Sequence, residues 1–236
     1  MAGDNMTEKN NTTEKLYMKD AYLKEFEAHV IKIMGNQVLL DKTAFYSERG
    51  GQVGDTGFIN NTRVIDTKYN KSENNRNDEN DESKQYILHI IEGNPYFKEG
   101  DVILGRIDWD RRYKIMKNHA ASHITEYFLD QIFGKLKLVG TLVNEKHDSS
   151  TYIYHEALDK DKLLQVERLS NEFILKGYEI ERWEDPDRHG WWYWKAGEIT
   201  MPCGGTHPLN TEEIGQISIK RKSGGKGKEK IFTMSI

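Results

Sequence analysis

The hydrophobic pattern of this chain changes its period once, near Trp109, and this change constrains the fold more than any other feature. Upstream, short apolar runs are separated by turn residues such as Gly35-Asn36, which predicts antiparallel strands joined in hairpins. Downstream, apolar residues recur at helical spacing from Asp110 to about Phe133. We therefore predict an α+β fold. A small antiparallel β-barrel-like N-terminal domain precedes an α+β domain in which helices pack on an antiparallel sheet.

The same patterns give the boundaries of the parts. Residues 1–15 predict a disordered tail, 16–108 the glycine-rich β domain, and 109–236 the α+β domain. A polar run at 70–84 predicts a solvated insertion between two strands. Asp110 and Asp159 are candidate caps for two helices that end near Gly134 and Gly177. The strands we expect cover 28–34, 37–40, 58–59, 63–65, 86–91, 101–108, 152–154, 178–183, 214–220 and 230–235.

Composition excludes several classes of protein. The chain has 236 residues, of which 36% are hydrophobic, so it can bury a core, and no apolar run approaches the roughly 20 residues of a membrane span. The N-terminus lacks the apolar stretch of a signal peptide, and the single cysteine excludes an intrachain disulfide, which fits a reducing cytoplasm. The net charge of −4 argues against nucleic-acid binding over the whole surface, but it allows a local basic patch.

Two short motifs predict a metal site. His119 and His123 are four residues apart on the first predicted helix, so both imidazoles project from the same face. Cys203 and His207 are also four apart, and the two glycines between them allow a tight turn. Three histidines and a thiol suit one tetrahedral Zn²⁺ per chain. A His-x3-His pair or a buried cysteine alone is common without a metal, but the combination favours zinc.

The chain resembles the editing domain shared by alanyl-tRNA synthetase, threonyl-tRNA synthetase and the free-standing AlaX proteins. The resemblance rests on His119-x3-His123, on Cys203-Gly-Gly-Thr-His207, and on the glycine-rich stretch 45–57 that contains Gly50-Gly51-Gln52, which is typical of the alanyl branch. It covers roughly residues 20–236 and leaves no room for a synthetase catalytic core, so the chain looks like an AlaX protein of the type with a glycine-rich N-terminal domain. Residues 47–49 are Ser-Glu-Arg, where the resemblance leads us to expect a Pro near the start.

The resemblance implies a cytoplasmic, ATP-independent hydrolase whose substrate is tRNA(Ala) mischarged with serine, and to a lesser extent with glycine. A pocket for alanine cannot strongly reject a substrate that merely adds a hydroxyl, so a second site must remove the product. Thr43 offers a hydroxyl that can sense serine, and its position in the family suggests this role. The loop at Gly50, Gly51 and Gln52 can bring backbone N–H groups to a substrate oxygen, and the Gln52 amide can orient a water or the ester.

Several alternatives stay open at this stage. Four protein ligands close a tetrahedral site, so either His207 is a loose ligand, or the zinc becomes five-coordinate, or the zinc only orders the pocket. Ser-tRNA(Thr) editing and tRNA binding with a purely structural zinc are the competing functions. A zinc peptidase is disfavoured, because His119-Ala-Ala-Ser-His123 lacks a Glu as general base.

The segment 220–230 holds six basic residues and one acidic residue. It is either a solvated loop or a contact for tRNA phosphates, and its mixture of Gly and Lys favours the second. The residues we predict to bind tRNA are Lys220, Arg221, Lys222, Lys226 and Lys228. No membrane partner is expected.

Overall fold

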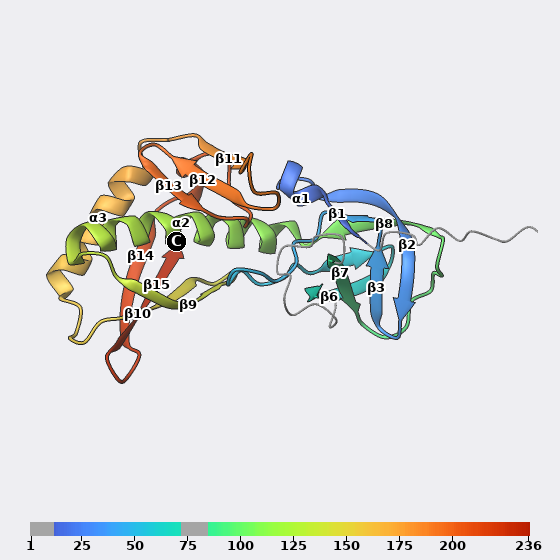
Figure 1. Ribbon diagram of the computed structural model, residues 1–236, viewed down its shortest axis with the longest axis horizontal. Helices are drawn as coiled ribbons and strands as arrows, with labels where there is room; N and C mark the ends of the chain where they lie inside the picture. The colour runs from blue at the N-terminus through green and yellow to red at the C-terminus, as the bar shows by residue number, and fades with distance from the viewer. Residues whose placement is uncertain (1–11, 72–84) are drawn as a thin grey trace, which may run out of the picture. The chain divides into compact units, whose positions relative to one another are not determined.

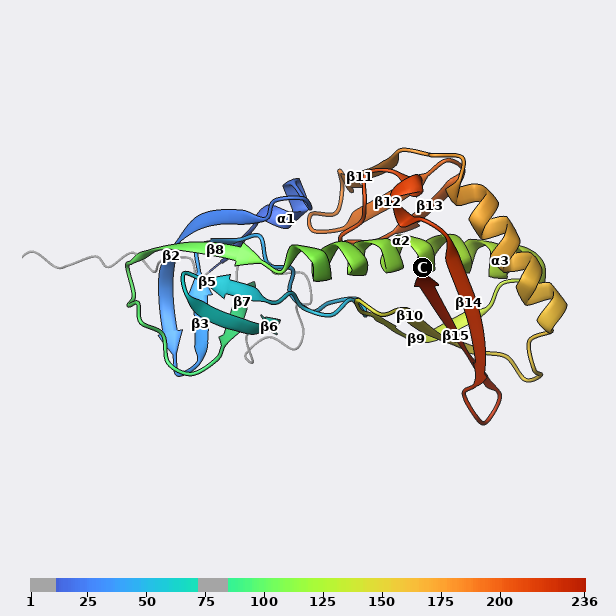
Figure 2. The same ribbon diagram turned by 180° about the vertical axis from the view of Figure 1, so that it is seen from behind.

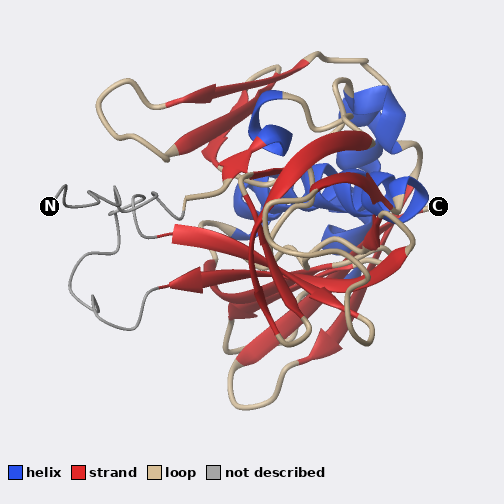
Figure 3. Cartoon of the chain, turned by 90° about the vertical axis from the view of Figure 1, so that its right-hand side faces the viewer, coloured by secondary structure: helices blue, strands red, loops and turns tan. Residues whose placement is uncertain are grey.

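The computed structural model describes residues 12–71 and 85–236, and these form two compact units. The first unit takes its residues from 1–47 and 54–107, and the second from 48–53 and 108–236. The short segment 48–53 therefore belongs to the second unit, although it lies within the N-terminal half of the sequence. Strands dominate and most helical residues lie in two helices, so the predicted α+β fold is confirmed (Figure 3).

The first unit is a closed barrel with the strand order β2-β3-β7-β6-β5-β8, and all the pairs in it are antiparallel. The predicted barrel-like domain is thus confirmed. The predicted turn at Gly35-Asn36 joins β2 to β3, and a second turn at Asn60-Asn61 joins the strands that we predicted at 58–59 and 63–65. Apolar side chains from every strand fill it, and those of Val38, Leu40 and Ile87 are fully buried. The bounds are β2 Glu25–Met34, β3 Gln37–Leu40, β5 Gly57–Ile59, β6 Thr62–Lys71, β7 Gln85–Ile91 and β8 Val102–Ile107.

Two predictions at the edges of this unit need correction. The predicted tail ran to residue 15, but β1 (Glu14–Lys15) pairs in parallel with β4 (Lys42–Thr43), and α1 (Leu16–Lys19) follows it. The polar composition of the segment did not indicate this contact. The Thr13 hydroxyl donates a hydrogen bond to the Leu40 carbonyl, but in the sequence Thr13 cannot be distinguished from the other polar residues of the tail. The predicted insertion began at residue 70, whereas β6 continues to residue 71. Residues 1–11 and 72–84 lie outside the described residues.

In the second unit one long helix, α2 (Trp109–Phe133), lies between two antiparallel sheets. Figures 1 and 2 show the helix in green, with the three-stranded sheet on one side of it and the four-stranded sheet on the other. The smaller sheet has the order β11-β12-β13, and the larger has the order β14-β15-β10-β9. The bounds are β9 Lys137–Val143, β10 Asp148–Ile153, β11 Ile180–Glu184, β12 Trp192–Ala196, β13 Ile199–Pro202, β14 Ile217–Ser223 and β15 Lys228–Ser235.

Small and apolar residues let α2 approach both sheets. Ala120, Ala121 and Ile124 pack in one core cluster with Trp194 of the smaller sheet. Leu129, nearer the C-terminal end of the helix, packs in a second cluster with residues of β10, β15 and α3 (Lys160–Ile174). His119 and His123 of the predicted metal site lie between apolar residues on this helix, so packing fixes the backbone that carries them.

The helix termini agree with the predictions except at one cap. Asp159 caps α3 by accepting a hydrogen bond from the Lys162 N–H, and Gly134 follows α2 with a φ of 79°. However, α2 begins two residues earlier than a cap at Asp110 implies, so Asp108 occupies the N-cap position, and it makes no side-chain cap hydrogen bond. A 3₁₀ turn at Thr211–Ile214 replaces the start of the strand predicted at 214–220. No helix among the described residues is long and apolar enough to cross a membrane.

Candidate metal centre

Four predicted ligands converge on one point of the second unit. His119 and His123 come from successive turns of α2, and Cys203 and His207 come from the turn that follows β13. The turn approaches the helix so closely that a Cβ on Gly205 would lie 2.2 Å from Cε1 of His119. Only glycine fits there. The sequence motif therefore specifies the approach of the turn as well as two of the ligands.

The spacing of the ligand atoms matches a tetrahedral metal site. The Cys203 sulfur is 3.5 Å from Nε2 of both His119 and His207, and the two Nε2 atoms of His123 and His207 are 3.1 Å apart. All four ligand atoms lie within 4.8 Å of one another. Around a tetrahedral zinc, sulfur and nitrogen ligands are about 3.5 Å apart and two nitrogens about 3.3 Å. These four residues could therefore hold a metal ion.

The protonation of the ligands is set by burial. Burial lowers the pKa of His123 to about 4 and lowers those of His119 and His207 well below the usual value. The three imidazoles are thus neutral at pH 7, which is the form that binds metals. Burial raises the pKa of the Cys203 thiol to about 11, against the smaller effects of the Gly205 N–H and the Arg182 charge. A coordinating cation ionises such a thiol outright.

Gln52 adds a second layer to this centre. Its side-chain oxygen lies 2.8 Å from Nδ1 of His119, and it also accepts a hydrogen bond from the backbone N–H of Thr206, at 3.1 Å. Its amide nitrogen donates to the Thr206 hydroxyl at 2.8 Å. The structure thus places Gln52 against a ligand and against the turn that carries two others. Sequence reasoning singled out Gln52 but not Thr206.

The predicted substrate residues fall in different units. Gly50 and Gly51 have positive φ angles of 60° and 87°, and they belong to the second unit with Gln52. A Cβ on Gly51 would lie 2.4 Å from the Thr141 side chain, so the loop packs tightly on β9. Thr43, in β4, belongs to the first unit. Its hydroxyl is 2.8 Å from Nε2 of His89 and accepts the Phe45 N–H, so substrate sensing by Thr43 stays a prediction.

The predicted basic segment forms the β14–β15 hairpin, whose strand register divides its cations between two faces. Lys222 lies opposite Lys230, and Lys220 lies opposite Phe232, all on one face. Arg221 points to the other face, where it pairs with the buried carboxylate of Glu229. Lys226 lies in the turn, with a φ of 48°.

A buried carboxylate near α2 escaped the sequence analysis. Asp148 is 1% exposed and accepts hydrogen bonds from the hydroxyls of Ser150 and Thr141. Burial raises the pKa of Asp148 to about 7, although hydrogen bonds from Ser150, Thr141 and Ser122 oppose this. The alternation of Asp148 and Ser150 along one strand was the available signal. Because aspartate is mostly exposed in proteins, residue type alone gives no indication of a buried acid at this position.

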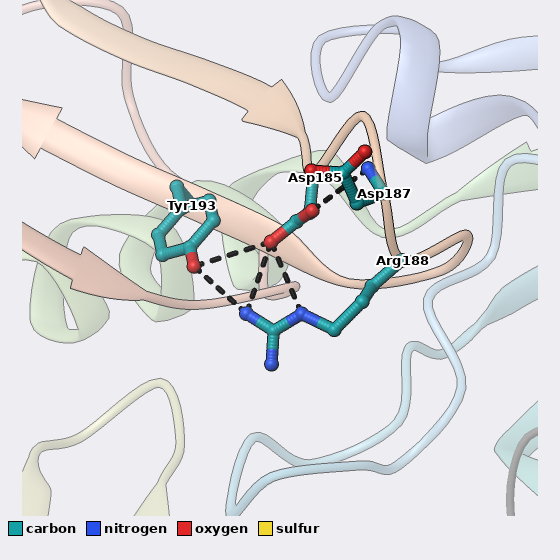
Figure 4. Close-up of polar contacts among 4 residues, drawn as sticks. All are labelled: Asp185, Asp187, Arg188 and Tyr193. Carbon is teal, nitrogen blue, oxygen red and sulfur yellow. Dashed lines mark hydrogen bonds and ion pairs between the residues drawn. The ribbon is translucent and has the colours of Figure 1, made fainter.

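An exposed polar cluster holds the loop between β11 and β12 (Figure 4). Asp185 accepts hydrogen bonds from the Arg188 guanidinium at 3.0 and 3.2 Å, and the Tyr193 hydroxyl lies within hydrogen-bond distance of both residues. The Arg188 guanidinium stacks on Trp191, 4.7 Å from the ring centre. This cluster orders the loop and brings no ligand to the metal centre.

Comparison with known proteins is consistent with this geometry. Residues 3–111 match the family model described as tRNA synthetases class II (A). The chain is 37% identical over 225 residues to the alanyl-tRNA editing protein AlaX-M of Pyrococcus horikoshii, covering 94% of this chain and 97% of the relative. It is 34% identical to the AlaX-M protein of Saccharolobus solfataricus, covering 93% of this chain and 98% of the relative. It is 30% identical to an alanine–tRNA ligase of Methanococcus maripaludis, of which it spans 24%.

Proposed function

Since the chain belongs to the AlaX-M family of alanyl-tRNA editing proteins, we propose that it hydrolyses the ester of tRNA(Ala) carrying the wrong amino acid. The wrong amino acid is serine and, to a lesser extent, glycine, and the products are the free amino acid and uncharged tRNA. The observation that carries the proposal is the group of three buried histidines and one cysteine whose ligand atoms lie within 4.8 Å of one another. The names of the relatives support alanyl-tRNA editing, and this group of residues supports a site for the chemistry.

The metal that fits best is one Zn²⁺ per chain. The ligand set is soft and borderline, the ligand atoms are spaced as in a tetrahedral zinc site, and the histidines are neutral at pH 7. When bound there, zinc would supply a Lewis acid. His119, His123, Cys203 and His207 would hold the cation, and the three histidine side chains are buried.

Selectivity for serine requires a polar group that meets one hydroxyl, because serine and alanine differ only there. Thr43 remains the residue we propose for this role. Its own hydroxyl hydrogen is engaged: Nδ1 of His89 faces the Val38 carbonyl at 3.0 Å, so Nε2 of His89 is left as an acceptor for Thr43. To sense serine, the Thr43 hydroxyl must therefore exchange its bond to His89 for one to the substrate.

The partner surface we propose for tRNA is one face of the four-stranded sheet. The register places Lys220, Lys222, Lys228 and Lys230 on the same face, with Lys137 of β9 alongside Ile153. Within these four strands the only carboxylates, Asp148 and Glu229, point to the opposite face. The Phe232 ring lies among the lysines and stacks on His147 at 5.2 Å. Uncompensated lysines around an aromatic ring are suited to RNA phosphates and bases.

Deacylation of purified aminoacyl-tRNAs tests the proposed activity. The protein should release serine from Ser-tRNA(Ala), leave Ala-tRNA(Ala) largely intact, and lose activity when a chelator removes the metal. Ser-tRNA(Thr) serves as the control for the competing editing reaction. If the protein binds tRNA but releases serine from neither substrate, with zinc at full occupancy, the hydrolase proposal is wrong and the zinc is structural.

A further inference from the structure

Backbone hydrogen bonds anchor the segment 48–53 to the second unit. Arg49 and Gln52 exchange backbone hydrogen bonds of 3.1 and 3.2 Å, which close a tight turn. Gly51 and Val53 then pair with Val143, at the end of β9, through bonds of 2.8 and 3.1 Å. Substitution of the Gln52 side chain leaves each of these bonds available. The side chain is therefore free to have a role of its own.

The hydrogen bonds of Gln52 define which end of its amide faces which partner. A backbone N–H can only donate, so the atom facing Thr206 N must be the amide oxygen. The same oxygen lies 2.8 Å from Nδ1 of His119, so Nδ1 must carry the hydrogen. The other ring nitrogen, Nε2, then presents its lone pair 3.5 Å from the Cys203 sulfur, where the metal ligands converge.

We propose that Gln52 is a positioning residue of the metal centre, holding His119 in the tautomer and ring orientation that ligation needs. It also ties the helix that carries two ligands to the turn that carries the other two, because both partners meet at one amide. Acceptors behind metal-bound histidines typically contribute 10–100-fold to metal affinity. This proposal rests on the metal centre proposed above, and it replaces direct contact with water or ester as the principal role of Gln52.

The chemistry of the position favours an amide. The fully buried side chain must accept two hydrogen bonds and donate one. Leucine has similar volume but makes none of these bonds. Glutamate keeps both acceptors, and the Thr206 hydroxyl can rotate to donate to its second oxygen. Leucine and glutamate therefore separate a hydrogen-bonding role from simple packing.

Zinc affinity, measured by competition with a chromophoric chelator, provides the first test. Gln52→Leu should weaken zinc binding by about 10–100-fold, and Gln52→Glu should stay within a few-fold of wild type. Thr206→Val removes one hydrogen bond and should weaken zinc binding by roughly 2–10-fold. Thr233→Val is the matched control, because the buried Thr233 hydroxyl has no hydrogen-bond partner among the described residues. Its zinc affinity should equal that of wild type.

Imidazole ¹⁵N NMR of the metal-free protein provides the second test, and it does not depend on zinc. The His119 Nδ1 proton should be observed and slow to exchange in wild type and in Gln52→Glu, and it should be lost in Gln52→Leu. Unchanged zinc affinity together with an unchanged His119 signal in Gln52→Leu would overturn the proposal. If Gln52→Leu does not fold, Thr206→Val decides by the same two readouts. If the wild-type protein binds no zinc but shows the protected His119 proton, the proposed metal site is wrong, while the hydrogen bond from His119 to Gln52 is confirmed.

Discussion

The Thr43 hydroxyl lies 2.8 Å from Nε2 of His89, and both side chains are fully buried inside the barrel. Nδ1 of His89 donates to the Val38 carbonyl, and the Phe45 ring packs edge-on against the imidazole at 5.3 Å. Every polar atom of the pair thus has a partner in the barrel. A residue singled out as a substrate sensor is therefore also part of the barrel core.

We expect Thr43→Val to have two separable effects. Loss of the hydroxyl leaves His89 with an unsatisfied buried nitrogen, so the free energy of unfolding should fall by about 1–3 kcal/mol. If Thr43 also meets serine, cleavage of Ser-tRNA(Ala) should fall by roughly threefold to tenfold, while cleavage of Ala-tRNA(Ala) changes less. Thr43→Ser keeps the hydroxyl and is the control for both measurements. If Thr43→Val is less stable but the ratio of the two cleavage rates is unchanged, Thr43 has only a structural role and does not sense serine.

The stability of the barrel should depend on pH through His89. Burial lowers the pKa of His89 to about 4, below its unfolded value near 6.5. As pH falls, the unfolded chain therefore takes up the proton before the folded chain does. The contribution of neutral His89 to the free energy of unfolding is lost as pH falls from about 6.5 to about 4. The loss amounts to about 3 kcal/mol. Urea unfolding of wild type and His89→Gln across this range should show a smaller acid loss in the variant. Parallel curves would show that His89 does not titrate in this way.

We expect Asp148 to give the stability of the second unit the opposite dependence on pH. Burial raises the pKa of Asp148 to about 7, so the folded state keeps the proton that the unfolded state loses near pH 4. The contribution of protonated Asp148 to the free energy of unfolding is complete below about pH 4. It decreases by a few kcal/mol as pH rises to about 7. Asp148→Asn mimics the protonated acid, so its stability relative to wild type should rise over this interval. A constant difference in unfolding free energy between pH 4 and 7 would contradict the raised pKa.

The elements that the sequence predicted correctly share local signals. The hairpins at Gly35-Asn36 and Asn60-Asn61, and the helix capped by Asp159, depend on residues close together in the chain. The convergence of the four candidate metal ligands was also predictable, because each pair is four residues apart and geometry within one turn brings it together. Residue type and short spacing sufficed for these features.

The missed features depend on distant partners. Gln52 and Thr206 are 154 positions apart, and no local pattern connects them. Strand β12 begins in the tryptophan-rich run 191–194, and in it the buried Trp194 alternates with the more exposed Tyr193 and Lys195. That alternation was hidden, because aromatic residues occupy both faces. Arg221 illustrates the limit of composition: only the strand register shows that it faces Glu229 instead of joining the lysines.

Cysteine chemistry offers a direct check on the metal centre. Cys203 is the single cysteine of the chain, so a thiol reagent reports on it alone. Bound zinc should protect the thiol from modification, and a chelator should remove the protection and release about one zinc per chain. Cys203→Ser replaces a soft ligand with a hard one and should lower zinc occupancy. A thiol that reacts equally with and without the chelator would show that Cys203 is not a ligand.

The lysine face of the four-stranded sheet predicts a specific salt dependence of tRNA binding. Each phosphate contact releases counterions, so changing Lys220, Lys222, Lys226 and Lys228 together to Gln should reduce the slope of log affinity against log salt by up to about 3–4. Zinc content should not change, because none of these residues is near a ligand in sequence or shares a strand with one.

The control changes four exposed lysines elsewhere, Lys32, Lys98, Lys160 and Lys176, and has the same net charge. If both variants lower the slope equally, tRNA responds to net charge only, and the sheet face is a solvated surface. A selective loss in the first variant, made greater by Phe232→Ala, would identify this face as the contact for RNA.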